Sequence, residues 1–328
     1  MERRPSMVPG PPAESVLYSR PYSEPENNRR NFVKNLSGQV AVVTGGASGI
    51  GRGMGEAFLE RGMKVVLADV EAEALAATVA ELRDRGGEVV GVECDVSDSR
   101  SVEHLRDESL THFGAVHVLC NNAGVAGGGG VATWEAPQAD WDWVIGVNLM
   151  GVIYGIRHFI PVMIEQGAPA HVVNTASLAG LIHGMGIYGV TKHAVVALSE
   201  SVWSELRTAG HAVGVSVLCP GWVRTRILES ERNRPEAPRP DPGPARPEAE
   251  AFREIVGRMI EQGMDPIDVG RLVADSIETD QFYVLPHPQW LNVVENRMRR
   301  ILDQEDPIGV QPEGGMGIEL STPSDKPD

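Results

Sequence analysis

Tyr188 and Lys192 are the residues whose types and spacing most directly suggest chemistry. They lie four positions apart in the segment Tyr188–Arg207, whose apolar residues recur at the spacing of a buried helix. Side chains at positions i and i+4 share one helix face, so the Lys192 ammonium can lie near the Tyr188 phenol oxygen. A free tyrosine has a pKa near ~10, and a nearby cation lowers it. Tyr188 is therefore a candidate general acid and base.

A glycine-rich turn follows the Val-rich segment Val40–Thr44 and leads directly into the segment Arg52–Glu60. A pyrophosphate must approach such a turn more closely than a Cβ atom allows, and it binds the free amides of a helix N-terminus. The sequence therefore predicts a dinucleotide site at this turn. The predicted contact residues are Gly45, Ser48, Gly49, Ile50 and Gly51.

Asp69 ends the next Val-rich segment, at the distance of about 20 residues beyond the glycines where an acidic residue binds the adenosine ribose. Its carboxylate can accept hydrogen bonds from the ribose hydroxyls and repels a 2′-phosphate, which favours NAD over NADP.

A dinucleotide site also changes the interpretation of Tyr188 and Lys192. Their spacing alone fits an ordinary surface helix whose lysine reaches into water, but beside such a site it favours catalysis.

The elements that must position these residues alternate along the chain. From Gln39 to about Leu302, short Val/Leu/Ile segments alternate with longer amphipathic ones, which is typical of βα units around a parallel sheet. The predicted strands are Val40–Thr44, Lys64–Ala68, Glu88–Glu93, Val116–Asn121, Ala170–Asn174, Val213–Leu218 and Phe282–Leu285. The predicted helices cover 50–61, 72–85, 99–113, 138–166, 187–209 and 248–262, with another opened by Asp265-Pro266. We predict one α/β domain over residues 36–303, a doubly wound Rossmann-like fold with a seven-stranded parallel sheet.

Three segments differ from this pattern in composition. Residues 1–35 are rich in proline and predict an N-terminal extension. Residues 231–250 contain six prolines, which exclude a helix interior and a central strand, so we expect an excursion within a substrate lid at 222–264. Residues 304–328 are rich in Gly, Pro, Glu and Asp and predict a disordered tail.

Composition argues against several classes of function. The chain has 45 acidic and 29 basic residues, a net charge of −16, which opposes binding to nucleic acid phosphates. No apolar run reaches the ~20 residues of a membrane helix, and no residue pattern has metal-ligand spacing. Cys94, Cys120 and Cys219 lie within or beside apolar runs, as reduced core thiols do. We therefore expect a cytoplasmic protein with no metal, nucleic acid or membrane as a partner.

The order of five motifs resembles the short-chain dehydrogenase/reductase family. The motifs are TGxxxGIG from Thr44, Asp95-Val96, Asn121-Asn122-Ala123-Gly124, Tyr188-x-x-x-Lys192 and Pro220-Gly221. The resemblance spans about Leu36 to Leu302 and implies an NAD(P)-dependent enzyme that interconverts a secondary alcohol and a ketone. Ser48 and Val70 stand where NADP-preferring relatives often carry a basic residue, which again favours NAD.

The resemblance also implies roles for individual residues. Ser177 would hold the substrate oxygen, and Lys192 would lower the pKa of Tyr188. Asn148 would hold a water that links Lys192 to solvent, although a structural asparagine satisfied within its apolar stretch is the alternative. Asp95 would contact the adenine, the alternative being a cap for the helix that follows. The other implied cofactor contacts are Val96, Asn122, Ala123, Gly124, Tyr188, Lys192, Pro220, Gly221, Val223 and Thr225.

The loop before Tyr188 departs from the family pattern. Ser177 precedes Tyr188 by eleven residues, about two fewer than in common relatives. Thr175 has the usual spacing of thirteen, but the end of the predicted strand favours Ser177. The segment after Pro220-Gly221 is rich in apolar residues. These residues either wall a cavity for a hydrophobic alcohol or ketone, or only pack the lid onto the body.

Two other functions remain open from the sequence. One is an NADPH-dependent biosynthetic ketoreductase, and the other is a non-catalytic nucleotide-binding regulator on the same fold. The regulator explains the glycine turn and Asp69 but has no use for a phenol beside an ammonium, so we favour the dehydrogenase. Apolar helices such as Trp141–Met163 suit the homodimer or homotetramer that the family generally forms.

Overall fold

The computed structural model describes residues 32–127, 132–235 and 247–307. The predicted extension at 1–35 and the predicted tail at 304–328 therefore lie mostly outside the described residues, as do residues 236–246 of the predicted excursion. Val33 and Leu36 are already buried in the hydrophobic core.

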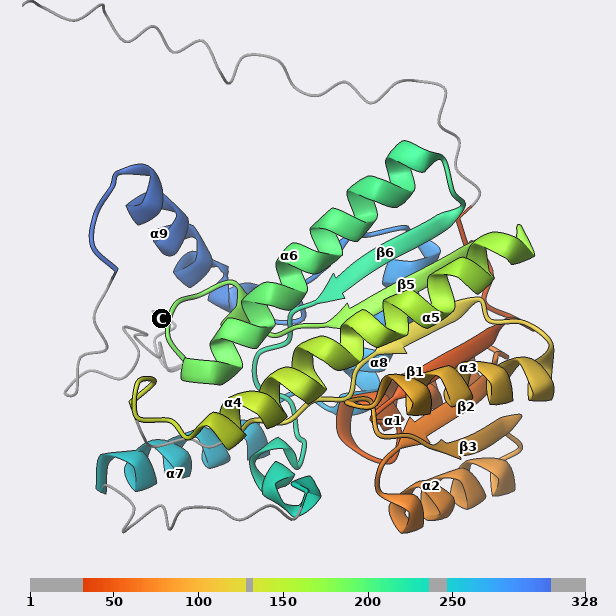
Figure 1. Cartoon of the computed structure of the whole chain (residues 1–328), viewed down its shortest axis with the longest axis horizontal. Coiled ribbons are helices and arrows are strands. Elements are labelled where there is room, and N and C mark those ends of the chain that lie inside the picture. The colour runs from red at the N-terminus through yellow and green to blue at the C-terminus, as the bar shows by residue number, and fades with distance from the viewer. Residues whose placement is uncertain (1–31, 128–131, 236–246, 308–328) are drawn as a thin grey trace, which may run out of the picture. The chain divides into compact units, whose positions relative to one another are not determined.

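Seven parallel strands form one sheet in the order β3-β2-β1-β4-β5-β6-β7 (Figure 1). The strands are β1 (Val40–Thr44), β2 (Lys64–Asp69), β3 (Val89–Glu93), β4 (Val118–Asn121), β5 (Ala170–Thr175), β6 (Val213–Leu218) and β7 (Tyr283–Val284). The order runs outward from β1 in both directions, so a crevice opens at the carboxyl ends of β1 and β4, where such sheets bind ligands. The predicted doubly wound fold with a seven-stranded parallel sheet is confirmed.

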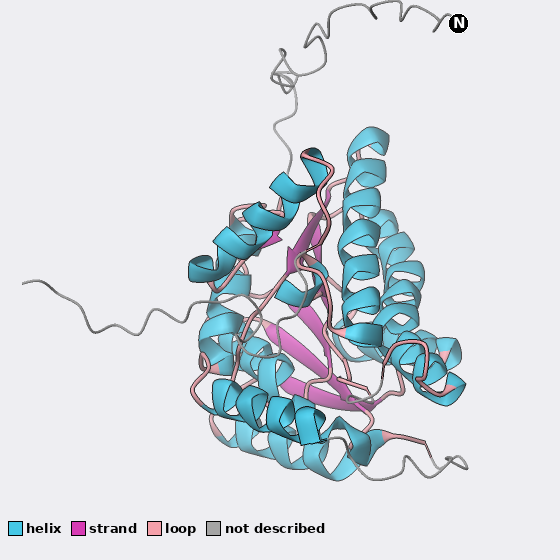
Figure 2. Ribbon diagram, turned by 90° about the vertical axis from the view of Figure 1, so that its left-hand side faces the viewer, coloured by secondary structure: helices cyan, strands magenta, loops and turns pink. Residues whose placement is uncertain are grey.

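Helices cover both faces of the sheet (Figure 2), which explains why the central strands read as continuous apolar runs. Helices α1, α2 and α8 bury apolar side chains in one core cluster, and α3, α5 and α6 do so in another. The helices are α1 (Gly49–Glu60), α2 (Ala72–Asp84), α3 (Ser99–Phe113), α4 (Gln138–Ile145), α5 (Gly151–Gln166), α6 (Gly186–Ala209), α7 (Pro247–Glu261), α8 (Pro266–Glu278) and α9 (Leu291–Leu302).

The segment predicted as one helix at 138–166 contains a π-helical turn at Gly146–Met150, between α4 and α5. Such turns often mark functional sites. By length and apolarity alone, Gln138–Gln166 is the one helix among the described residues that could cross a membrane. Phe159 and Met163 of α5 nevertheless pack into the core on the sheet, which is the behaviour of a core helix.

The C-terminal third contains both confirmed and unexpected elements. Pro266 begins α8, and the Asp265 side chain accepts a hydrogen bond from Ile267 N at 3.3 Å, as the helix start predicted from these residues requires. Helix α9 was not predicted. Around the proline-rich stretch, a 3₁₀ helix covers Ile227–Asn233 and α7 begins at Pro247, so both ends of the predicted excursion at 231–250 are helical.

All three cysteines lie within the described residues, and each is buried with a free thiol. Burial raises the pKa of Cys94 to about 11 and that of Cys219 to about 12, and it also raises the pKa of Cys120. The prediction of reduced core thiols is confirmed.

Helices α1 and α8 approach each other closely through two glycines. A Cβ atom on Gly53 would overlap with the carbonyl oxygen of Pro266, and one on Gly270 would overlap with the carbonyl oxygen of Gly53. This contact fixes α1, which follows the glycine-rich turn, against the first turn of α8. The close approach of the two backbones therefore holds α1 in place beside the crevice.

We predict that Gly53→Ala lowers the free energy of unfolding by about 1–3 kcal/mol, because the added methyl group forces the two helix backbones apart. The measurement is urea denaturation followed by circular dichroism. Gly257→Ala is the matched control, since a Cβ atom there meets nothing within 4 Å. The control gains up to ~1 kcal/mol from helix propensity. Equal stability of the two variants would contradict the prediction.

Candidate active site

One cavity of about 1580 Å³ lies at the carboxyl ends of the strands. This volume exceeds the ~300–1,000 Å³ of a pocket for one small ligand, so a dinucleotide and a second molecule both fit. Of the predicted site residues, Gly51 and Asn148 do not line the cavity. The predicted residues that do line it are Gly45, Ser48, Gly49, Ile50, Asp69, Asp95, Val96, Asn122, Ala123, Gly124, Ser177, Tyr188, Lys192, Pro220, Gly221, Val223 and Thr225.

The glycine-rich turn has the geometry that a pyrophosphate needs. Gly45 has φ +67°, and a Cβ atom there would lie 2.9 Å from Ala123 Cα. A Cβ atom on Gly51 would overlap with Gly45 O, so Gly51 shapes the turn from behind the cavity wall. Ser48 precedes α1 without capping it through its side chain. The first amides of α1 therefore remain available to an anion.

Thr44, at the end of β1, positions the segment that follows β4. Its hydroxyl oxygen accepts hydrogen bonds from Asn122 N at 2.9 Å and Ala123 N at 3.1 Å, and Asn122 Nδ2 donates to Thr44 O at 2.9 Å. The Asn122 side chain thus braces the two strand ends. The sequence analysis did not assign this role to Thr44, although a hydroxyl residue at the end of a buried strand could have indicated it.

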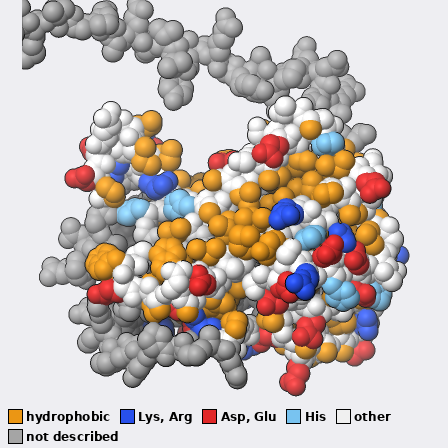
Figure 3. Space-filling model, viewed as in Figure 1, with side chains coloured by type: hydrophobic (Ala, Val, Ile, Leu, Met, Phe, Trp, Pro, Cys, Tyr) orange, Lys and Arg blue, Asp and Glu red, His pale blue; other side chains and the backbone are white. Residues whose placement is uncertain are grey.

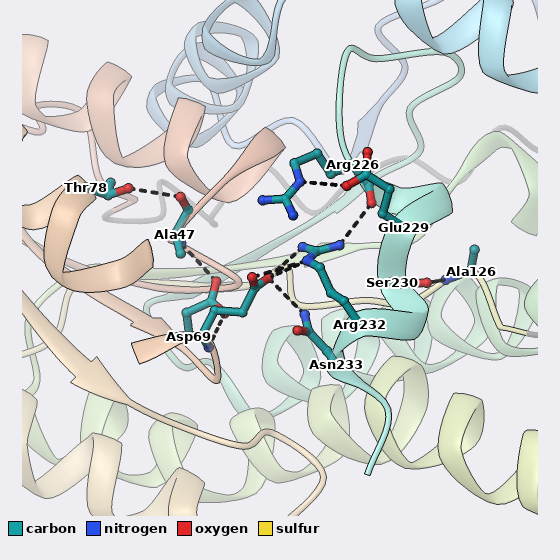
Figure 4. A network of polar contacts seen from close by, with 10 residues as sticks. Ala47, Asp69, Thr78, Ala126, Arg226, Glu229, Ser230, Arg232 and Asn233 are labelled. Carbon is teal, nitrogen blue, oxygen red and sulfur yellow. Dashed lines mark hydrogen bonds and ion pairs between the residues drawn. The ribbon is translucent and has the colours of Figure 1, made fainter. Parts of the chain in front are cut away.

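Asp69 lies where β2 reaches the cavity. Its carboxylate accepts hydrogen bonds from Ala47 N at 2.9 Å and Glu71 N at 3.0 Å. Thr78 of α2 donates to Ala47 O at 3.0 Å. These contacts, drawn in Figure 4, fix the carboxylate against the glycine-rich turn. A carboxylate has about four acceptor sites, so Asp69 keeps capacity for ribose hydroxyls.

The segment Ile227–Asn233, the cover segment, lies across the Asp69 end of the cavity (Figure 4). Arg232 forms an ion pair with Glu71 at 2.6 Å, and Asn233 Nδ2 donates to the same carboxylate at 2.9 Å. The hydrogen bond from Arg232, followed by that from Asn233, holds the pKa of Glu71 below its usual value. Ser230 Oγ accepts a hydrogen bond from Ala126 N at 3.1 Å. The cover segment is thus attached at both sides of the crevice.

Asp95 shapes the turn between β3 and α3. Its Oδ1 accepts hydrogen bonds from Ser97 N at 2.9 Å and from Ser97 Oγ at 2.7 Å. The N-cap of α3 is Asp98, whose carboxylate accepts from Arg100 N at 2.9 Å. The alternative that Asp95 caps this helix is therefore wrong.

Tyr188 and Lys192 on α6 meet Ser177, which follows β5. Lys192 Nζ lies 5.5 Å from the centre of the Tyr188 ring and donates a hydrogen bond to Thr175 O at 3.0 Å. Burial raises the pKa of Tyr188, and a hydrogen bond with Ser177 opposes this shift. Burial also lowers the pKa of Lys192 to about 8. The phenol form of Tyr188 is thus favoured at neutral pH, and the cation beside it is easily lost in alkali.

Ser177 is the hydroxyl beside Tyr188, and Thr175 is not. Ser177 Oγ accepts a hydrogen bond from Ala179 N at 3.1 Å and donates to Pro220 O at 3.4 Å. The Thr175 hydroxyl instead donates to Asn122 Oδ1 at 3.3 Å, away from the phenol. The short loop before Tyr188 is closed by a 3₁₀ turn at Leu178–Gly180 and by three successive residues of positive φ, 184–186.

Asn148 lies in the π-helical turn and is fully buried. Its Oδ1 accepts a hydrogen bond from Val125 N at 2.8 Å, and its Nδ2 donates to Val125 O at 2.9 Å. A Cβ atom on Gly124 would lie 3.4 Å from Asn148 Oδ1 and 3.5 Å from Lys192 Nζ. The side-chain amide therefore holds the backbone beside Lys192, as the structural alternative expects.

His287 supports the segment after β6 and was not predicted. Its Nδ1 accepts a hydrogen bond from Gly221 N at 3.0 Å, and its Nε2 donates to Trp222 O at 3.0 Å. Burial lowers the pKa of His287, which favours this neutral form. Because 66 residues separate His287 from Gly221, no local sequence pattern could predict their contact.

An apolar chamber adjoins Ser177 within the same cavity. It is formed by Leu178, Ile182, Trp222, Trp290 and Val293. The rings of Trp222 and Trp290 meet edge to face, with centres 6.2 Å apart. Trp222 belongs to the apolar segment after Pro220-Gly221, which we expected either to wall a cavity or to pack the lid. The sequence gave no sign of Trp290, which reaches the chamber from the start of α9.

Comparisons with known proteins agree with this geometry. The family model described as short chain dehydrogenase matches residues 39–236. The chain is 34% identical to the "CLA biosynthesis dehydrogenase/reductase" of Lactiplantibacillus plantarum, over 84% of this chain and 97% of that protein. It is 37% identical to the "1-deoxy-11-beta-hydroxypentalenate dehydrogenase" of Streptomyces exfoliatus, over 76% and 83% of the two chains.

Among solved structures, a short chain dehydrogenase/reductase from Burkholderia phymatum in complex with NAD is 46% identical. The alignment covers 84% of this chain and 98% of that chain, with a TM-score of 0.80. The predicted family and the predicted enzyme class are thereby confirmed. The chain belongs to the short-chain dehydrogenase family and is an oxidoreductase that acts on CH–OH groups.

Proposed function

We propose that the protein is an NAD-dependent dehydrogenase that interconverts a hydrophobic secondary alcohol and its ketone. The observation that carries the proposal is the meeting of Tyr188, Lys192 and Ser177 in the cavity that also receives Asp69 and the glycine-rich turn. A phenol, an ammonium and a hydroxyl donor together supply proton transfer and stabilise the substrate oxygen.

The residues of the crevice suit NAD. Gly45, Gly49 and the first amides of α1 would hold the pyrophosphate, and Asp69 would hold the adenosine ribose. Val70 adds no cation that would favour a 2′-phosphate. NAD, when bound, accepts hydride from the alcohol carbon or returns it to the ketone carbon. The NAD complex of the Burkholderia phymatum relative supports this choice.

Tyr188 moves the proton in this scheme. As phenolate it accepts the hydroxyl proton of the alcohol, and as phenol it returns that proton to the ketone oxygen. Ser177 Oγ donates a hydrogen bond to the same substrate oxygen, in place of its 3.4 Å bond to Pro220 O. The Lys192 ammonium stabilises the phenolate electrostatically while Thr175 O holds it in place. Asn148 maintains the backbone beside Lys192.

A hydrophobic substrate is supported by the apolar chamber and by the hydroxypentalenate named for the Streptomyces relative. Residues 222–264 would form the lid, since Trp222, Ile227 and Val256 line the cavity. The ketoreductase alternative shares all these residues and differs in its cofactor and direction. The regulator alternative does not explain why an ammonium and a hydroxyl lie beside the Tyr188 phenol.

The assembly and cellular location are proposed on separate grounds. Hydrophobic side chains gather on the surface over α5 and α6 (Figure 3), which suits a homodimer or homotetramer. The free, buried thiols suit a cytoplasmic protein.

We predict that Tyr188→Phe lowers kcat/KM for alcohol oxidation by about 10²–10⁴-fold, because the phenol oxygen is the proton acceptor. NAD affinity, measured by fluorescence titration, stays unchanged. Tyr154→Phe on α5 is the control, since Tyr154 lies outside the cavity. An unchanged kcat/KM in Tyr188→Phe with NAD still bound would show that Tyr188 is not the proton acceptor.

We predict that Asp69→Asn lowers kcat/KM with NAD by roughly tenfold and raises it with NADP by a similar factor. The exchange weakens the acceptor for the ribose hydroxyls and removes the charge that repels a 2′-phosphate. Steady-state kinetics with both cofactors measure the effect. Asp98→Asn, at the N-cap of α3, is the matched control. A wild-type preference for NADP would support the ketoreductase alternative instead.

We predict that oxidation accelerates and ketone reduction slows as the pH rises from about 7 to about 8, the range in which Lys192 still keeps its charge. Burial raises the pKa of Tyr188, so alkali is needed to form the phenolate that oxidation uses, whereas reduction uses the phenol. Lys192→Met moves the rise in oxidation to higher pH, because the phenolate loses its neighbouring cation. The measurement is kcat/KM against pH in both directions. Superimposable profiles for wild type and Lys192→Met would refute the assignment.

A further inference from the structure

Helix α9 contributes one face to the wall of the cavity. Val293, Asn296, Arg297, Arg300 and Ile301 line the cavity, at the spacing of residues that share one side of a helix. The helix starts beside Trp290 in the apolar chamber and leads away from it. With a rise of 1.5 Å per residue, Arg297 lies ~10 Å along the axis from Trp290. The same cavity thus begins apolar and becomes cationic.

Arg297 is a half-buried cation with most of its donors unused. Its Nη1 donates to Leu181 O at 3.4 Å, and no carboxylate among residues 32–127, 132–235 and 247–307 forms an ion pair with it. Its neighbours differ, since Arg299 pairs with Glu295 and Arg300 with Glu305, each at 2.7 Å. A guanidinium carries five N–H donors in a planar fork that matches a carboxylate.

The charge of the cavity changes from one end to the other. Asp69, Glu71 and Asp95 line the end that suits adenosine, and the arginines there, Arg226 and Arg232, are paired with Glu229 and Glu71. Arg297 lies instead on α9, which starts at the apolar chamber, and it has no ion pair among the described residues. Glu305 also lines this end, but it is paired with Arg300. A second ligand at the apolar chamber therefore meets positive charge at its far end.

We propose that Arg297 binds a carboxylate of the substrate, so that the substrate is a hydrophobic hydroxy or oxo carboxylic acid. Its alcohol or ketone lies at Ser177 and Tyr188, its apolar body fills the chamber, and its acid group pairs with Arg297. This inference rests on the proposed dehydrogenase function and specifies the substrate class. Leu181 belongs to the loop between Ser177 and Tyr188, so Arg297 also joins α9 to the catalytic loop.

The test compares matched substrates that differ only in charge. The probes are medium- and long-chain fatty acids with a secondary hydroxyl next to the terminal methyl group, and the methyl esters of the same acids. NAD reduction is measured for the wild type, Arg297→Gln and Arg299→Gln. The last variant is the control, because Arg299 lies on α9 outside the cavity wall and pairs at the surface.

The wild type is expected to prefer each acid to its ester by about ten- to hundredfold in kcat/KM. Arg297→Gln removes this preference because it raises KM for the acids by far more than KM for the esters. Arg299→Gln leaves the preference as it is in the wild type. Equal loss of activity on acids and esters assigns Arg297 a structural role and overturns the proposal, as does a wild type that prefers the esters.

If acids and esters both fail while a neutral panel of secondary alcohols is oxidised, the proposed substrate class is wrong but the proposed dehydrogenase function stands. If no alcohol is oxidised, the proposed function itself fails.

Discussion

The hydrogen bond from Lys192 Nζ to Thr175 O, 3.0 Å long and fully buried, is the interaction on which the site depends. A buried ammonium without a partner is costly, so this bond holds α6 against the end of β5. A second buried contact, from Asn174 Nδ2 to Ser199 Oγ at 3.0 Å, joins the same two elements. Tyr188 comes from one of them and Ser177 follows the other. Their meeting is therefore a result of how the sheet and α6 are joined.

Other parts of the cavity wall are held by residues distant in sequence. Glu71 follows β2, yet it is held by Arg232 and Asn233 of the cover segment. His287 holds the backbone after β6 through two hydrogen bonds. A parallel sheet brings its strand ends to one edge, and these contacts help to close that edge into a cavity. The sheet is thus formed by the regular pairing of strands, whereas the cavity wall depends on individual side-chain contacts between distant parts of the chain.

This division explains what the sequence could and could not predict. The strand segments, the glycine-rich turn and the spacing of Tyr188 and Lys192 follow from local periodicity and from the need for backbone close approach. The structure brings the turn, Tyr188 and Lys192 together at one cavity. For Ser177 the sequence left Thr175 as the other choice, and the structure places Ser177, not Thr175, beside Tyr188. Nothing in the local sequence predicted that α9 and Trp290, which precedes it, would line the cavity. An amphipathic segment near the end of a chain is indistinguishable from a surface helix until the element that it packs against is known. Contacts across 66 or 161 residues are of the same kind.

The buried thiols bear on how the protein withstands its own chemistry. Ketones, and above all unsaturated ketones, are electrophiles that add to thiolate anions. Cys219 directly precedes the cavity wall at Pro220, but with a pKa of about 12 it is almost wholly protonated at neutral pH. Cys94 lines the cavity with a pKa of about 11 and is similarly inert. These two thiols are therefore weak nucleophiles toward a carbonyl compound in the cavity.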